Sequence, residues 1–159
     1  MEYNRAAVVS YADRWALSRN PRYFDFENFG GDCTNFVSQS VYAGWGVMNY
    51  TRTFGWYYNS SFDRAPAWSG VNEFYNFLLR KNRELKDQSG PLGIDTTYEK
   101  LELGDIAQLN AEGVRFTHTL IVTAFDVDGA PLFSTHSMDS HNRRLESWEY
   151  KEVRFIHIV

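Results

Sequence analysis

The stretch that decides the fold is Gly30-Gly31-Asp32-Cys33-Thr34-Asn35-Phe36-Val37-Ser38-Gln39. Asp32 is one of the residue types that favour the N-cap position of a helix. Apolar residues at helical spacing follow it, which predicts a buried helix over residues 33–43 that stops at Gly44. Cys33 then lies in the first turn, where unpaired backbone N–H groups favour an anion. We therefore expect a lowered pKa for the Cys33 thiol.

Length and composition favour one domain with one core, because the chain has 159 residues. The formal net charge is −4, and the longest basic run is the pair Arg143-Arg144. These features argue against a nucleic-acid partner. Cys33 is the only cysteine, which excludes an internal disulfide and a thiolate-rich zinc site.

The sequence predicts no membrane span, because no apolar stretch approaches about 20 residues. The polar N-terminus also lacks the apolar core of a signal peptide. The chain could be cytoplasmic or a domain of a longer secreted protein, and its oligomeric state stays open.

Hydrophobic spacing places helices first and strands afterwards. The expected helices cover residues 4–20, 33–43 and 70–82, and Pro21 ends the first one. Residues 44–68 and 83–100 are expected to form loops. The expected strands cover residues 105–109, 117–125, 131–135 and 152–159. This order predicts an α+β fold, with N-terminal helices packed on a C-terminal antiparallel sheet.

A nucleophilic thiol needs a base that carries its proton to the leaving group, and an imidazole suits that task. His118 begins one predicted strand and His136 ends the next, and an Asp128-Gly129 turn pairs the two strands. We therefore predict His118 as the general base for Cys33 and His136 as the group that orients His118. Asp139 is the alternative orienting group, because a carboxylate would better stabilise the imidazolium.

The segment after the second of these strands has a rival use. His136, Asp139 and His141 could offer nitrogen and oxygen ligands to a metal, but their spacing matches no strong metal motif. Glycine-rich nucleotide loops are missing as well. We expect neither a metal nor another cofactor, and we interpret His141 and His157 as surface or structural residues.

Aromatic residues make up 17% of the chain and gather after residue 44. The rings expected to wall a cleft beside Cys33 are Trp45, Trp56, Tyr57, Tyr58 and Trp68. Within this set we predict Trp56 and Trp68, together with Asp32, as substrate-binding residues. Simple packing in the core is the alternative interpretation of the rings.

The same residues resemble a known family. The stretch from Gly30 to Gln39, Gly104-Asp105-Ile106 and His118-Thr119-Leu120-Ile121-Val122 are similar to the putative amidase domains of bacteria. That family is related to the NlpC and CHAP group of papain-like cysteine peptidases and amidases. The resemblance covers nearly the whole chain and implies a single domain over residues 1–159 with a papain-like, NlpC-type fold. It implies the same roles for Cys33, His118 and His136.

The leading hypothesis is a cysteine-dependent hydrolase that cleaves an amide bond through a thioester intermediate. A peptide or a small amide is the expected substrate, and the resemblance implies cell-wall peptide. The alternative is a non-catalytic module that binds a peptide or glycan in an aromatic cleft. Acyl transfer to an amine shares the thioester chemistry, and the residues do not separate it from hydrolysis.

Overall fold

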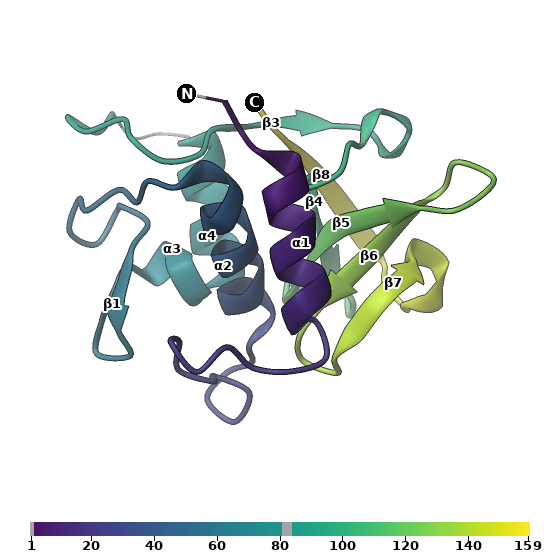
Figure 1. Cartoon of the computed structure of the whole chain (residues 1–159), viewed down its shortest axis with the longest axis horizontal. Helices are drawn as coiled ribbons and strands as arrows, with labels where there is room; N and C mark the ends of the chain where they lie inside the picture. Colours follow the sequence, from purple (N-terminus) through teal and green to yellow (C-terminus); the bar gives the residue numbers. More distant parts are fainter. Residues whose placement is uncertain (1, 81–83) are drawn as a thin grey trace.

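The computed structural model describes residues 2–80 and 84–159 (Figure 1). Its α-helices are α1 (Arg5–Trp15), α2 (Cys33–Trp45), α3 (Pro66–Ser69) and α4 (Val71–Leu79). Two 3₁₀ turns, η1 (Tyr98–Lys100) and η2 (Leu145–Ser147), lie in the second half. The strands are β1 (Tyr58–Ser60), β2 (Asp63–Arg64), β3 (Gly93–Thr96), β4 (Ile106–Asn110), β5 (His118–Phe125), β6 (Pro131–Thr135), β7 (Ser140–Arg144) and β8 (Glu152–Ile158). Helices in the first half and an antiparallel sheet in the second confirm the predicted α+β class.

The main sheet has six antiparallel strands in the order β3-β8-β4-β5-β6-β7. Ile121 and Ile156 flank Ile106 on neighbouring strands. These three side chains pack with the helices in one core, on the face that α1 covers in Figure 1. Leu109 and Leu120 point to the other face and belong to a second core. The alternation of side chains along β5 therefore places Ile121 in one core and Leu120 and Val122 in the other.

The two long helices approach each other closely at a glycine. A Cβ atom at Gly44 would overlap the Val8 side chain and the Asn4 carbonyl oxygen. Gly44 is therefore a contact position inside α2 and not the predicted stop. The helix ends at Trp45 and is capped by Gly46, whose φ of 82° is the left-handed conformation that glycine adopts readily.

The first helix is shorter than predicted, ending at Trp15 and not at residue 20. The Trp15 carbonyl oxygen accepts hydrogen bonds from the backbone N–H of Ser18 and from the His136 ring. These two donors therefore occupy the Trp15 carbonyl oxygen, which in a longer helix would accept from the backbone N–H four residues later. Tertiary contacts, more than Pro21, end this helix.

Both predicted loops contain regular structure. Residues 44–68 include β1, β2 and most of α3, and residues 83–100 include β3 and η1. The polar strand β7 was not predicted either, because Ser140-His141-Asn142-Arg143-Arg144 lacks the β-branched pattern of a strand. The predicted end of the third helix at residues 81–82 lies outside the described residues. No helix within the described ranges has the length and apolar character that crossing a membrane requires.

Candidate active site

Cys33 lies where helix and sheet meet. It is the first residue of α2, and only 6% of it is exposed. Its sulfur lies 3.7 Å from the Thr34 hydroxyl, which in turn lies 2.8 Å from the Thr119 hydroxyl on β5. Thr119 directly follows His118 on β5. The predicted helix start at Cys33 is therefore confirmed, and its sulfur faces the first residues of β5.

Burial raises the pKa of the Cys33 thiol, and the negative charge of Asp32 raises it further. Hydrogen bonds from Thr119 and Thr34 oppose this shift but do not outweigh it. The expectation of a lowered pKa is wrong, because the thiol has lost nearly all contact with solvent. The resting form of Cys33 at neutral pH is therefore the protonated thiol.

A buried polar network fixes the residues beside the sulfur. The Thr34 and Thr119 hydroxyls lie 2.8 Å apart, and the Gln108 amide donates to Thr119 at 3.2 Å. The same amide donates to the Val71 carbonyl oxygen at 2.9 Å. The starts of α2, β5 and α4 are thus joined through three side chains that are almost fully buried. Sequence reasoning missed this network, although a threonine directly follows both Cys33 and His118.

His118 is the first residue of β5, as predicted. It alternates with Thr119, so its side chain points to the sheet face of the second core. Its ring centroid lies 6.4 Å from that of Trp148. Burial lowers the pKa of His118 to about 4, and the positive charge of Arg143 contributes. Within residues 2–80 and 84–159, no hydrogen bond joins this ring to the Cys33 sulfur, so their pairing stays a prediction.

His136 follows β6 and is buried, but it does not contact His118. Its Nδ1 atom lies 2.5 Å from Oδ2 of Asp32, and its Nε2 atom lies 2.8 Å from the Trp15 carbonyl oxygen. The ring also stacks on Phe36 with centroids 4.2 Å apart. The predicted orienting role of His136 is therefore not supported, because both ring nitrogens already have other partners on the helix-facing side of the sheet.

The alternative orienting group and the rival metal ligands are also dispersed. Asp139 forms a two-pronged ion pair with Arg19, with distances of 2.7 and 3.0 Å. His141 lies 2.8 Å from an Asp13 carboxylate oxygen. Asp139, His136 and His141 thus each have their own partner and do not converge on one point.

The turn after β6 holds the loop that precedes Cys33, and both lie at the lower edge of Figure 1. The Ser137 hydroxyl accepts a hydrogen bond from the Asp32 backbone N–H at 2.8 Å. A Cβ atom at Gly31, where φ is +100°, would lie 3.0 Å from that hydroxyl oxygen. Sequence reasoning missed Ser137, and the Gly-Gly pair was the available signal that another segment comes close.

The predicted substrate-binding residues occupy structural positions. Trp56 and Trp68 have no exposed surface, and their indole N–H groups donate to Ser38 and Asn35. Asp32 is 1% exposed. The prediction of a substrate-binding role is wrong for the two tryptophans, because fully buried rings pack in the core. The carboxylate of Asp32 is committed to partners inside the protein and leaves no side for a substrate.

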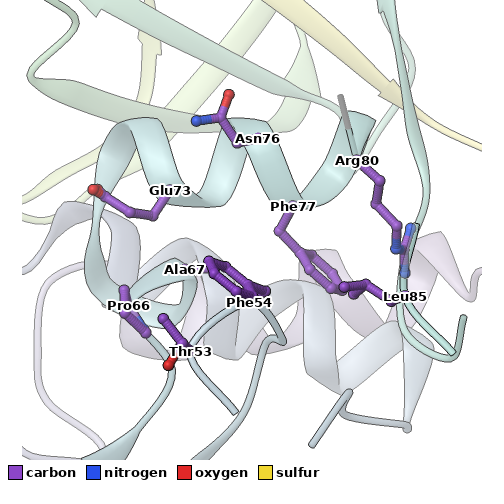
Figure 2. A pocket seen from close by; sticks show the side chains of 9 residues that line it. All are labelled: Thr53, Phe54, Pro66, Ala67, Glu73, Asn76, Phe77, Arg80 and Leu85. Atoms are coloured by element: carbon purple, nitrogen blue, oxygen red, sulfur yellow. The ribbon is translucent and has the colours of Figure 1, made fainter. Parts of the chain in front are cut away.

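A pocket away from Cys33 is lined in part by Phe54, from the aromatic-rich stretch after residue 44. It is a cavity of about 170 Å³ lined by Thr53, Phe54, Pro66, Ala67, Glu73, Asn76, Phe77, Arg80 and Leu85. Figure 2 shows Glu73 at one end and Arg80 at the other, with apolar side chains between them. Neither Cys33 nor His118 lines this cavity.

One group of side chains in the described residues has the spacing of metal ligands. Glu102, Asp105 and His157 each bring a ligand atom within 4.8 Å of the others. Arg5 donates to Asp105 at 2.9 Å, and Asp105 also accepts from His157 and from backbone N–H groups. A guanidinium already supplies positive charge here, so the group forms an ionic contact between α1 and β8 that is centred on the buried Asp105.

Comparison with known proteins points to one family. A family profile described as a putative amidase domain matches residues 2–159. The chain is 31% identical over 174 residues to the uncharacterized protein YhbB of Bacillus subtilis, covering 99% of this chain and 51% of that protein. It is 30% identical over 130 residues to the uncharacterized protein YjcM of the same organism, covering 77% of this chain and 28% of that protein. The chain thus spans about half or less of these relatives. No solved structure matches it.

Proposed function

Because the chain belongs to the putative amidase domain family, we propose that it is a hydrolase that cleaves an amide bond with Cys33 as its nucleophile. One observation carries the proposal: the hydroxyl of Thr34, which follows Cys33, lies 2.8 Å from the hydroxyl of Thr119, which follows His118. A thiol at a helix start thus faces the strand that carries an imidazole. This is the order of elements on which a cysteine–histidine pair depends.

The pKa shifts of the two groups support a neutral resting pair. Burial raises the pKa of Cys33 and lowers that of His118 to about 4. A thiol and a neutral imidazole therefore coexist at pH 7. In the proposed reaction, His118 accepts the thiol proton as the sulfur attacks the carbonyl carbon, so no thiolate accumulates beforehand.

The remaining steps follow from proton balance. The imidazolium returns its proton to the amide nitrogen, the carbon–nitrogen bond breaks, and an amine leaves behind a thioester. His118 then takes a proton from water as the water attacks the thioester carbon. The carbon–sulfur bond breaks, Cys33 regains its proton, and a carboxylic acid is released. The mechanism requires the His118 ring to turn from the sheet face of the second core towards the Cys33 sulfur when substrate binds.

The resemblance of Gly30 to Gln39 to papain-like NlpC and CHAP proteins supports a peptide substrate, and cell-wall peptide is the first class to test. Soluble cell-wall peptides and small N-acyl amino-acid amides would be incubated with the purified chain. Release of amines would be followed by mass spectrometry. We expect turnover to fall at least about 10³-fold in Cys33→Ala and in His118→Ala. His141→Asn is the matched control, and undiminished turnover in Cys33→Ala would refute the nucleophile.

A non-catalytic binding module is the second candidate, and the burial of Cys33 favours it. A structural cysteine is buried and inert, whereas a nucleophile must be reached by substrate. Iodoacetamide labelling of the folded chain at pH 7 separates the two candidates. Labelling that requires denaturation, together with no turnover of any amide, would favour the binding module.

A further inference from the structure

The ring of His136 faces two hydrogen-bond acceptors. The Trp15 carbonyl oxygen lies 2.8 Å from Nε2, and a carbonyl oxygen can only accept, so Nε2 carries a proton. Oδ2 of Asp32 lies 2.5 Å from Nδ1. An ionised carboxylate also only accepts, so a second proton must lie between Nδ1 and Oδ2. The two hydrogen bonds need two protons. A neutral His136 beside an ionised Asp32 supplies only one.

The surroundings hold that second proton in place. Both residues are 1% exposed, so water does not replace either partner. The other carboxylate oxygen of Asp32 accepts from the Phe26 backbone N–H at 2.8 Å and from the Asn35 amide at 2.9 Å. An unpaired charge at such a depth is costly, which favours a pair that is neutral overall.

Other charged groups face the pair from the neighbouring loops. The Nε atom of Arg19 lies 3.7 Å from Oδ2 of Asp32. Arg19 itself is shared among the carboxylates of Asp25, Glu27 and Asp139. Three further carboxylates pair with the same guanidinium. Its positive charge is therefore not available to neutralise Asp32 by itself. The positive partner that Asp32 requires is His136.

We propose that Asp32 and His136 share one proton and act as positioning residues for Cys33. This inference rests on the proposed role of Cys33 as the nucleophile. The pair links the start of α2 to the end of α1, and the charge of His136 balances the Asp32 carboxylate beside the Cys33 thiol. Removing the charge of Asp32 and removing the charge of His136 should therefore change thiol reactivity in opposite directions.

Two variants remove one charge each while keeping most of the hydrogen bonds. In Asp32→Asn, the amide oxygen can face Phe26 and Asn35 while the amide nitrogen donates to Nδ1 of a neutral His136. In His136→Asn, the amide nitrogen can still donate to Asp32, but the carboxylate loses its positive partner. His141→Asn is the control, because His141 pairs with Asp13 on the surface.

The first readout is the pH profile of Cys33 alkylation by iodoacetamide. At pH 7 we expect alkylation to be about three- to tenfold faster in Asp32→Asn and slower by a similar factor in His136→Asn. The control should match the wild type. A purely structural role would move both variants in the same direction. That result, or unchanged rates in both variants, would overturn the proposal.

The second readout is nuclear magnetic resonance of the ¹⁵N-histidine-labelled wild-type chain, which does not depend on whether the variants fold. We expect a protonated Nε2 and a second, strongly downfield proton between Nδ1 and Oδ2, both lost in His136→Asn. A single ring proton at pH 7 would refute the shared proton. Failure of the nucleophile assignment is distinct, because it would appear as full turnover in Cys33→Ala with the shared proton intact.

Discussion

The hydroxyl groups of Thr34 and Thr119 lie 2.8 Å apart and join the first turn of α2 to the first residues of β5. Their neighbours, Cys33 and His118, are the proposed nucleophile and base. The threonine pair therefore fixes the spacing between the two chain segments on which the chemistry depends. It also supports the Gln108 amide, which reaches from the sheet to α4.

Replacing Thr119 with valine keeps the shape of the side chain but removes the buried hydroxyl that Thr34 and Gln108 share as a hydrogen-bond partner. We expect the free energy of unfolding to fall by about 1–3 kcal/mol, which urea denaturation would measure. Turnover should fall as well, because the spacing of Cys33 and His118 loosens. Thr117→Val, at an exposed position next to His118, is the control and should change stability by less than about 0.5 kcal/mol.

The charge of Arg143 should add to the effect of burial in lowering the pKa of His118. Arg143→Gln removes a positive charge that helps to depress the pKa of His118, so that pKa should rise from about 4 towards its ordinary value. The acid limb of kcat/KM should move to higher pH with it. Titration of the His118 ring by nuclear magnetic resonance checks the shift directly. Arg144→Gln, the next residue on β7, is the control, and an equal shift in both variants would contradict the assignment.

Stability should depend on pH through His118. Between about pH 4 and pH 6.5, the unfolded chain binds a proton at His118 that the folded chain does not. The free energy of unfolding contributed by this residue therefore falls as the pH falls through that range, by at most about 3 kcal/mol. His118→Gln should flatten this part of the profile in urea titrations at a series of pH values. A profile as steep as that of the wild type would assign the effect to other groups.

The close contact of α1 and α2 should make Gly44→Ala strongly destabilising. The added methyl group would overlap Val8 and the Asn4 backbone, and overpacking of this kind costs about 1–3 kcal/mol or more. Gly46→Ala is the matched comparison, since its Cβ would meet no atom within 4 Å and only its left-handed backbone resists the change. Thermal denaturation should show a larger loss at position 44, and the reverse order would contradict the packing argument.

The buried tryptophans should matter for stability more than for substrate binding. In Trp68→Phe, the side-chain amide oxygen of Asn35 loses the indole N–H donor that lies 2.9 Å away. We expect a loss of about 1–3 kcal/mol in the free energy of unfolding, with KM unchanged. A raised KM at unchanged stability would contradict this prediction and indicate that Trp68 binds substrate.

Local patterns in the sequence determined the frame of the fold. Asp32 and the apolar spacing after it placed Cys33 at a helix start, and Asp128-Gly129 identified the hairpin between β5 and β6. These features depend on neighbours a few residues away, so they can be read from the chain itself. The order of helices and strands then fixed the α+β class, and a family profile matches nearly the whole chain.

Only the tertiary structure decided which side chains of the candidate site are buried and which partners they contact. Whether the Cys33 thiol is exposed or buried, and hence the direction of its pKa shift, depends on what β5 and the preceding loop place around it. His136 pairs with Asp32, 104 residues away in sequence, because the turn that follows β6 lies against the loop that precedes α2. Burial and long-range partners are properties of the packed chain, and no local pattern of residues encodes them.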